Sequence, residues 1–480
     1  MSNYLSPGVY IEDNKNPSVV QSSSAFTGGF LGIAQRGPVG VPVLVTSWNS
    51  FLNSFAYGMT TPFLADSDLA YSVYGFFQNG GSRCYVVRVA SNTAKAATAD
   101  TADLLGEHKP VITARDAGVW GNSLKLKISA NVTTPENFDI AVSLNGEVVE
   151  YLQNLSNTTD SDNYWIDYVN YTSNFITGTS GELEVAESIT FKSGADGVSD
   201  IDDDDFTRAL TFLDTFEDLN LLCVPGQTSE EMNTAIMTYC EGRKDVFAIL
   251  DAPKASTVES VIALKKRMSC DNAALFFPWI RVSDYVSRTG RLRDCPTCGH
   301  VMGVYARVLQ NSGAWRAPAG TTAVVRGAVE VLTSLTTADV DTLNPAGIVS
   351  ILPKTNYGIV VWGARNLSSN PDMKYVSDVL LDIYIKKSVR EATQQFVFEP
   401  NDANTWMQVT TVVQSFLDSL WRDGALAGST ASQAYFVKCD EDLNPENSRK
   451  EGKLVCEVGY ANKKPSEFVI FRFSHDVQSQ

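Results

Sequence analysis

Three short apolar segments, separated by helical patterns, constrain the possible folds of this chain most strongly. Leu219–Val224, Val246–Asp251 and Ala273–Ile280 are apolar along nearly their whole length, and residues 229–243 and 256–268 between them have helical patterns. Strands that are apolar on both faces and alternate with helices are typical of a parallel sheet covered by helices. The middle of the chain is therefore predicted to form an α/β layer.

The composition limits the class of protein and its partners. The chain has 480 residues, of which 44% are hydrophobic and 19% charged, which is typical of a protein with several packed cores. Its net charge of −17 argues against binding to nucleic acid or to an anionic membrane. The start of the chain, Met1–Pro7, has no signal-peptide pattern, and the longest apolar stretch is far shorter than the roughly 20 residues of a membrane span. The eight scattered cysteines indicate a reducing cytoplasm.

The segment before this layer has a different period. Leu124–Ile128 and Phe138–Leu144 alternate between apolar and polar residues, and Asn145-Gly146 follows the second of them. An Asn-Gly pair between alternating runs is a strong signal for a β-hairpin. Residues 106–198 are therefore predicted to be rich in strands, as a small sandwich, with residues 93–105 as a connector.

The two ends of the chain have strand patterns with different surroundings. Gly8–Glu12 is a short extended segment with no hairpin partner near it in sequence, so it is interpreted as an arm that pairs with something distant. Near the other end, a helix is expected from Asn401 or Asp402 to Gly424. The strands expected after this helix are Ala434–Cys439, Lys453–Tyr460 and Glu467–Phe473. A chain bounded by such segments can donate strands to its neighbours.

Cys295 and Cys298 form the most tempting chemical motif, in the sequence Cys-Pro-Thr-Cys-Gly-His that ends at His300. Two thiolates at this spacing can hold one side of a zinc ion, but a structural site needs four ligands and the chain has no second such motif. A metal site, a redox pair and a loop without chemistry all remain open, and the last is favoured. No metal or other cofactor is expected.

Other candidate sites are weaker. Asp202–Asp205 could bind a cation, but it lacks the spacing of a calcium loop, so a solvated acidic linker at a domain boundary is expected. Pro225–Thr228 follows an apolar strand and lacks the glycine pattern and the lysine of a phosphate loop, so an ordinary strand-to-helix turn is expected. The three histidines, His108, His300 and His475, lie outside any recognisable hydrolase or metalloprotease motif. The chain is therefore not expected to be an enzyme.

Short motifs rich in glycine, proline and tryptophan are spread over nearly the whole chain. They are Tyr4–Glu12, Gly28–Gly32, Arg36–Pro38, Ala117–Asn122, Gly194–Gly197, Gly313–Gly320, Leu343–Ile348, Trp362–Arg365, Phe398–Asn401 and Pro465–Val469. In this order they resemble the contractile tail sheath proteins of bacteriophages and related injection machines. Ala195 stands where that family usually has glycine, and the Asp294–His300 segment has no counterpart in the general pattern.

The resemblance implies an α+β multidomain fold. Its expected parts are an N-terminal linking arm (1–20), an N-terminal α/β part (21–92), a β-sandwich insertion (93–198), a subtilisin-like α/β domain without a catalytic triad (199–357), a C-terminal α+β sheath domain (358–464) and a C-terminal strand or arm (465–480). In this family the arms add strands to sheets of neighbouring subunits.

The resemblance also implies a function. Such subunits form six-subunit rings, stacked as a helical sheath around an inner tail tube, and the sheath contracts to drive the tube through a cell envelope. The implied partners are further copies of the chain, the tube protein, the baseplate and the tail terminator, in a virion tail or tail-like particle assembled in the bacterial cytoplasm. The alternatives are a static shell or surface polymer and a hydrolase on the α/β domain.

The resemblance assigns two sets of residues to contacts between subunits. The strand-exchanging arms are expected to use Pro7, Gly8, Val9, Tyr10, Ile11, Phe468, Ile470, Phe471 and Phe473. The charged residues near helix ends that are expected to face the inner tube are Lys386, Lys387, Arg390, Asp418, Arg422 and Asp423.

Overall fold

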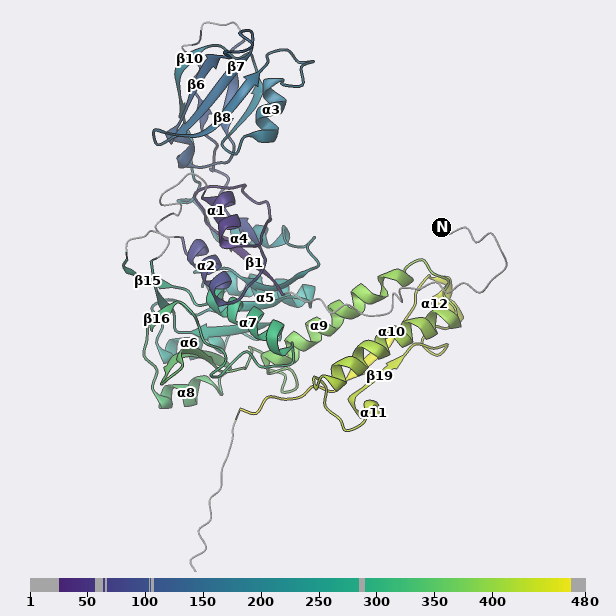
Figure 1. Ribbon diagram of the computed structural model, residues 1–480. Coiled ribbons are helices and arrows are strands. Elements are labelled where there is room, and N and C mark those ends of the chain that lie inside the picture. The colour runs from purple at the N-terminus through teal and green to yellow at the C-terminus, as the bar shows by residue number, and fades with distance from the viewer. Residues whose placement is uncertain are drawn as a thin grey trace, which may run out of the picture. The chain divides into compact units, whose positions relative to one another are not determined.

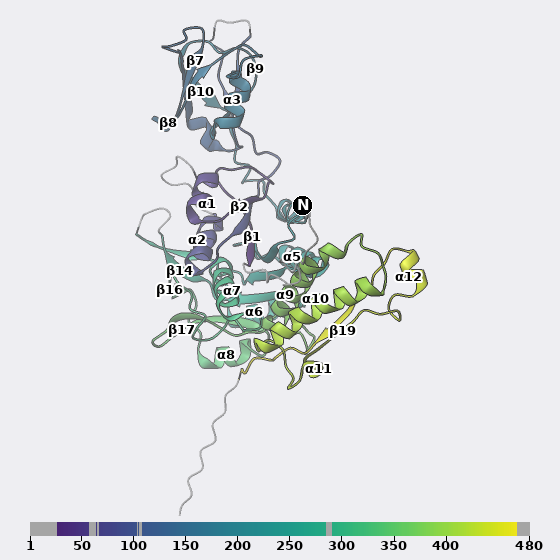
Figure 2. The ribbon, with the colours of Figure 1, turned by 45° about the vertical axis from the view of Figure 1, so that its right-hand side comes forward.

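The computed structural model combines helices and strands in two units, which confirms the predicted α+β multidomain class. One unit comprises Ala25–Ser312 with Arg316–Val379, and the other is built mainly on the chain from Leu380 onward, with Gly313–Trp315 (Figure 1 and Figure 2). The residues described are 26–56, 64, 67–102, 104, 108–284 and 290–467.

The first unit is built on an eight-stranded sheet in the order β18-β17-β13-β12-β11-β1-β3-β2. The six central strands are parallel, while β2 and β18 run antiparallel at the two edges. The strand bounds are β1 (Thr27–Gly32), β2 (Val43–Val45), β3 (Cys84–Arg88), β11 (Leu219–Cys223), β12 (Phe247–Asp251), β13 (Ala273–Phe277), β17 (Ile348–Lys354) and β18 (Gly358–Trp362). Every residue of β11, β12 and β13 is buried, which confirms the predicted α/β layer.

This sheet joins parts of the chain that the sequence analysis placed in separate domains. Strand β1, from the predicted part 21–92, pairs with β11, from the predicted domain 199–357. The backbone N–H of Thr27 also donates to Asn220 Oδ1 over 3.0 Å. Strand β18 extends the sheet beyond residue 357, so the predicted boundary at 358 is wrong, and the unit ends at Val379. Parallel pairing joins strands that are distant in sequence, so a local pattern does not reveal it.

Helices cover the sheet on both faces. Helices α4, α5, α6 and α8 contribute to one apolar core with the sheet, whereas α2 and α7 pack against each other, with α7 on β11 and β12. The helices are α1 (Trp48–Phe55), α2 (Leu69–Asn79), α4 (Asp203–Thr211), α5 (Glu230–Arg243), α6 (Val258–Lys265), α7 (Cys298–Ser312) and α8 (Thr337–Leu343). A small antiparallel sheet comprises β14 (Ile280–Ser283), β15 (Leu292–Cys295) and β16 (Ala328–Val331).

Two segments expected to be irregular are parts of regular elements. The acidic run is not a linker, because Asp202 caps α4 and exchanges hydrogen bonds with Asp205 in a capping box. Carboxylates stabilise a helix N-terminus, where backbone N–H groups lack partners. The Asp294–His300 segment is not a loop either, since it ends β15 and begins α7.

The chain between β3 and α4 forms a seven-stranded sheet in the order β8-β7-β6-β10-β4-β5-β9. Strand β10 pairs with β6 through its first part and with β4 at its end. It therefore belongs to both halves of the sheet and forms the corner between them. The elements are β4 (Thr98–Ala99), β5 (Val111–Ala114), β6 (Leu124–Ala130), β7 (Phe138–Leu144), β8 (Glu147–Leu155), α3 (Trp165–Thr172), β9 (Ile176–Ser180) and β10 (Ala186–Lys192). The predicted hairpin turn is confirmed, because Asn145 and Gly146 both have positive φ between β7 and β8.

Two buried arginines join this seven-stranded region to the eight-stranded sheet. The guanidinium of Arg36 lies between the rings of Trp120 and Phe175, 4.6 and 4.4 Å from their centroids. Arg88 Nη1 donates to the carbonyl oxygens of Gly37 and Ala117 over 2.8 and 2.7 Å. These hydrogen bonds and cation–π interactions position the seven-stranded region, in addition to the covalent connections of the chain.

The second unit pairs two long helices with a two-stranded sheet. Helix α10 begins after Asp402, which caps it, and ends before Gly424, which has a φ of 84°, as predicted. The elements are α9 (Val376–Thr393, which starts in the first unit), α10 (Ala403–Arg422), α11 (Ala431–Ala434), β19 (Tyr435–Lys438), α12 (Glu446–Lys450) and β20 (Glu457–Tyr460). Across the described ranges, no helix has the length and apolar character needed to cross a membrane.

Candidate functional site

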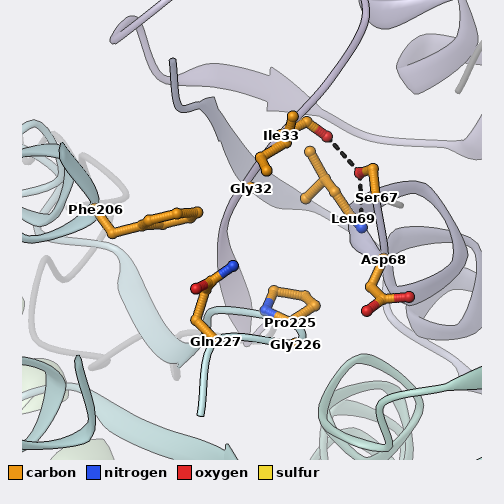
Figure 3. Close-up of a pocket in the computed structure, with 9 residues that line it drawn as sticks. All are labelled: Gly32, Ile33, Ser67, Asp68, Leu69, Phe206, Pro225, Gly226 and Gln227. Atoms are coloured by element: carbon orange, nitrogen blue, oxygen red, sulfur yellow. Dashed lines mark hydrogen bonds between the residues drawn. The ribbon is translucent and has the colours of Figure 1, made fainter. Parts of the chain in front are cut away.

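The first unit has a small pocket at the carboxyl ends of β1 and β11, where the order of the parallel strands reverses direction. Ligands of open α/β sheets usually bind at this kind of position. Figure 3 shows its lining: the end of β1, the start of α2, and the Pro225–Gln227 turn after β11, with Phe206 from α4. Its volume is about 80 Å³, well below the roughly 300 Å³ at which ligand sites begin.

The chemistry of this lining does not favour a phosphate. Asp68 is the charged residue in the lining, and its carboxylate accepts a hydrogen bond from Arg293 over 3.1 Å. The turn after β11 leads directly into α5, where the side chain of Ser229 accepts from the backbone of Met232. This arrangement agrees with the prediction that Pro225–Thr228 is an ordinary strand-to-helix turn.

Cys295 ends β15 and Cys298 begins α7, and both are completely buried. Burial raises the pKa of both thiols well above the ordinary value. Because a metal binds the thiolate, such an environment disfavours coordination. In the part of the chain that the structure describes, no three His, Cys, Asp or Glu residues are grouped so that they could hold a metal ion.

Asp251, at the end of β12, holds this helix start in place. Its Oδ1 accepts hydrogen bonds from the backbone N–H groups of Thr297 and Cys298, both over 2.9 Å. Its Oδ2 is buried without a hydrogen-bond partner among the described residues. Burial raises the pKa of Asp251 to about 7, although these two N–H groups oppose the shift. Sequence analysis did not identify this carboxylate. The signal that could have identified it is its position at the end of an otherwise fully apolar strand.

The two histidines that the structure describes lie in different surroundings. His300 is buried in α7, its Nδ1 has no hydrogen-bond partner in the described part of the chain, and burial lowers its pKa to about 4. Its ring lies against Gly75 of α2, where a Cβ atom would come within 2.3 Å of it. His108 is exposed, and His475 lies outside the described residues. His300 therefore fills a tight contact between two helices.

The two-stranded sheet of the second unit is a different kind of candidate site. Its register pairs Tyr435 with Tyr460, Val437 with Val458 and Lys438 with Glu457. Tyr435, Val437, Val458 and Tyr460 all pack on the apolar cluster formed with α9 and α10. Within the described ranges neither strand pairs with a third strand, so each presents one unpaired edge.

Asn444 holds the connection between these strands and is fully buried. Its amide nitrogen donates to the carbonyl of Val455 over 2.9 Å, and its Oδ1 accepts from the N–H of Val455 over 2.6 Å. The same amide lies 3.9 Å from the sulfur of Cys439. Sequence analysis missed this residue because a single asparagine in a polar segment has no distinguishing pattern.

The structure places the predicted tube-facing charges on α9 and at the end of α10. Lys386, Arg390, Arg422 and Asp423 are exposed, while Lys387 is buried, with 8% of its surface accessible. Lys386 forms an ion pair with Asp382, and Arg422 pairs with Asp418 over 2.8 Å. The buried position of Lys387 removes it from the set of surface contacts.

The predicted arm residues belong to the two ends of the chain. Those of the first arm, Pro7, Gly8, Val9, Tyr10 and Ile11, and those of the second, Phe468, Ile470, Phe471 and Phe473, lie outside the described residues.

Two family models match adjacent parts of the chain. Residues 203–367 match the phage tail sheath protein central domain, and residues 368–475 match the phage tail sheath C-terminal domain. Together they extend from the start of α4 to beyond β20. The predicted resemblance is therefore confirmed.

Curated relatives support the same family. The tail sheath protein of Burkholderia phage BcepMu is 27% identical over 239 residues, which are 46% of this chain and 47% of that protein. The tail sheath protein of Salmonella phage ViI is 23% identical over 329 residues, 65% of this chain and 50% of that protein. The chain thus spans about half the length of the curated relatives that it matches.

A solved structure shares the fold over the whole chain. The sheath of the PVC extracellular contractile injection system, in its contracted state, matches with a TM-score of 0.61 and 21% identity, covering 100% of this chain and 99% of that one. The family models, the curated relatives and the fold agree, and the chain belongs to the phage tail sheath family.

Proposed function

We propose that this chain is the subunit of a contractile tail sheath, which polymerises as a helical tube around an inner tube and contracts to drive that tube through a cell envelope. The observation that carries this proposal is the match of residues 203–475 to the two tail sheath domains. The related PVC sheath was solved in a contracted state, so a subunit of this fold exists in an assembly that contracts.

The β19–β20 sheet supports assembly by strand exchange. An edge strand has a row of backbone N–H and C=O groups that can pair with a strand from another chain. Two strands alone are marginally stable in water, and added strands complete such a sheet. The proposed donors are the arms at residues 1–20 and 465–480 of neighbouring subunits.

The exposed charges of the second unit support a contact with the inner tube. Lys386 and Arg390 on α9, with Arg422 and Asp423 at the end of α10, present charges of both signs, so an opposing surface with matched charges would set the register between sheath and tube. Such exposed pairs are screened by salt, so this contact should be sensitive to ionic strength.

The wider assembly is proposed on the same basis. Further copies of the chain would form six-subunit rings stacked helically, with the baseplate at one end and the tail terminator at the other. The assembly would occur in the bacterial cytoplasm and persist in a virion tail or tail-like particle. Contraction would exchange one set of contacts between rigid units for a larger set, a switch that needs no nucleotide.

The first unit, for which the family resemblance implies a subtilisin-like fold, would act as a scaffold in this assembly. A hydrolase of the Ser-His-Asp type needs a nucleophile beside a histidine that titrates, and the buried, neutral His300 is not such a histidine. A static shell is the second candidate, since an open sheet edge would also allow a lattice that does not contract.

Electron microscopy of the purified protein tests the proposal. A sheath subunit should form hollow tubes with a helical lattice, and tubes assembled on an inner tube should be found in a long, narrow form and a short, wide form. Flat sheets, closed shells or tubes of a single length and width would contradict it. Hydrolysis of a peptide or ester by the purified chain would revive the enzymatic alternative.

A further inference from the structure

Cys439 and Cys456 lie at the same end of the β19–β20 sheet and on the same face. The register pairs Val437 with Val458, and the next residues on that face along each strand are Cys439 and Cys456. Opposite residues of an antiparallel pair have Cα atoms about 4.5–5.5 Å apart. This range lies within the spacing that a disulfide requires.

The two thiols are close neighbours. The register places them opposite each other, and each affects the pKa of the other. The amide of Asn444 approaches the same sulfur, and it also holds Val455, the neighbour of Cys456, through two backbone hydrogen bonds. Asn444 therefore fixes both cysteines relative to each other, although neither belongs to the strand pairing itself.

These two cysteines are also the accessible ones. Cys439 and Cys456 are partly exposed, whereas all the other cysteines of the chain are buried. Cys223 and Cys298 are a second pair of neighbouring thiols, but both of these side chains have no accessible surface. Of these two pairs of neighbouring thiols, Cys439–Cys456 is the one that a dissolved oxidant can reach.

We propose that Cys439 and Cys456 form a reversible disulfide that links the ends of β19 and β20 and closes residues 440–455 into a loop. The inference rests on the geometry of a single subunit and is independent of the proposed function. The oxidant is a small disulfide, for which oxidised glutathione is the probe.

The exchange proceeds in two balanced steps. The thiolate of one cysteine attacks a sulfur of oxidised glutathione and releases one glutathione thiolate, leaving a mixed disulfide. The second cysteine, as its thiolate, then attacks the protein sulfur of this mixed disulfide and releases the second glutathione thiolate. The protein loses two protons and two electrons, and one oxidised glutathione becomes two reduced molecules.

Cys439 is the better first nucleophile. Burial raises the pKa of the Cys439 thiol, although the neighbouring Cys456 thiol and the Asn444 amide oppose this shift. Burial raises the pKa of Cys456 to about 12. The thiolate is the reactive form, so the less strongly shifted thiol reacts first.

Peptide mapping of the full chain tests the link. The folded protein is incubated with oxidised glutathione, remaining thiols are alkylated, and trypsin is added without a reductant. Trypsin cuts after Lys438, Arg449, Lys453 and Lys463, so the two cysteines end up in peptides 439–449 and 454–463. We expect these peptides as one linked species, two hydrogens lighter than their sum, which dithiothreitol separates.

Two matched variants serve as controls. Cys439→Ser should abolish the link, whereas Cys223→Ser, which removes one thiol of the buried pair, should leave its yield unchanged. The inference is overturned if glutathione remains attached to Cys439 or Cys456 without a link between them. It is equally overturned if Cys223 and Cys298 become linked at the same rate, since accessibility would then not decide which pair reacts.

The link should change the stability of the loop that it closes. A disulfide that closes a loop of about this length restricts the unfolded chain, so the melting temperature of the second unit should rise by several degrees on oxidation. Dithiothreitol should reverse the rise, and Cys439→Ser should not show it. A linked protein whose second unit melts at a lower temperature than the reduced one would show that the link strains the native hairpin.

Discussion

The two units of this chain differ in how completely their strands are paired within a single copy of the chain. In the first unit, six parallel strands lie between two antiparallel edge strands and are covered by helices on both faces. In the second, two strands pack on helices, and each has an unpaired edge within the described residues. A buried sheet of this size stabilises itself, whereas a two-stranded sheet is marginal alone. The first unit therefore suits a rigid scaffold, and the second suits contacts between subunits.

The cysteines of the two units show the same contrast. Cys295 and Cys298 have the spacing of a metal or redox motif, yet both are sealed in the first unit with raised pKa values. Cys439 and Cys456 have no recognisable spacing, yet the register brings them together at an accessible end of the hairpin. The spacing of two cysteines along the chain therefore does not predict whether their thiols can react with each other. Strand register and burial determine this.

The largest effect is expected from removing the arm at residues 1–20. If the second unit needs strands from its neighbours, this deletion should abolish polymerisation while both units stay folded. Sedimentation measures the polymer, and a thermal melt of the same sample measures folding. Full-length tubes from the truncated protein would contradict strand donation, and an unfolded monomer would show that the arm belongs to its own core.

Cutting the chain after Lys464 is the companion experiment. It removes the second proposed arm and should also block assembly. Because the segment that is lost follows β20 directly, some loss of stability is expected in the second unit and none in the first. A loss of stability confined to the first unit would contradict the view that the second unit, and not the first, depends on this segment.

A pH-dependent loss of stability is expected in the first unit. Asp251 has a pKa of about 7 in the fold, above its unfolded value of about 3.9, so the folded state binds more protons between these values. Its contribution to stability is therefore lost as the pH rises through this window. From pH 5 to pH 8 the loss should be about 2–3 kcal/mol.

Asp251→Asn isolates this contribution. The amide keeps an oxygen that can accept from Thr297 and Cys298 but does not titrate. Denaturant unfolding of the first unit at the two pH values should therefore differ less in the variant than in the unmodified protein. An identical difference in both proteins would mean that Asp251 is ionised in the fold at every pH tested.

The elements that sequence predicted well are those whose signal is local. The apolar strands β11–β13, the Asn145-Gly146 turn and the amphipathic helix α10 all have patterns contained within a few residues. Helix α9 was missed because its apolar residues do not form one stripe: its first turns are buried on several sides. The acidic run Asp202–Asp205 was misinterpreted as a linker because sequence analysis did not consider that negative charges stabilise the N-terminus of a helix.

The rest depended on contacts between distant segments. The pairing of β1 with β11 joins residues on either side of the inserted region, and no local pattern specifies it. The same holds for Asp251 at the start of α7, and for Asn444 between the strands of the second unit. The pair Cys439–Cys456 is an intermediate case. Both strands were predicted, and their register alone was needed to bring the thiols together.

Replacing Cys295 and Cys298 by serine should leave assembly intact. The thiols are inert and buried, so no metal or cross-link is lost. A buried hydroxyl without a good partner costs about 1–3 kcal/mol, so the first unit should be less stable while tubes still form. The matched control is Cys295→Ala with Cys298→Ala, which adds no hydroxyl. Loss of tubes in both double variants, together with stoichiometric zinc in the unmodified protein, would show that the motif binds a metal.

The smallest effect is expected from single charges on the second unit. Arg390→Glu reverses an exposed charge on α9 and should weaken co-assembly with the inner tube at low salt, by at most severalfold, because an exposed pair contributes about 0.2–1 kcal/mol. Lys266→Glu makes the same change of charge at an exposed position of the first unit and should have no effect. The difference between the variants should vanish at high salt, where exposed charges are screened. Equal co-assembly of both variants at low salt would mean that Arg390 does not face the tube, whereas equal weakening would show that net charge, not the surface of the second unit, governs binding.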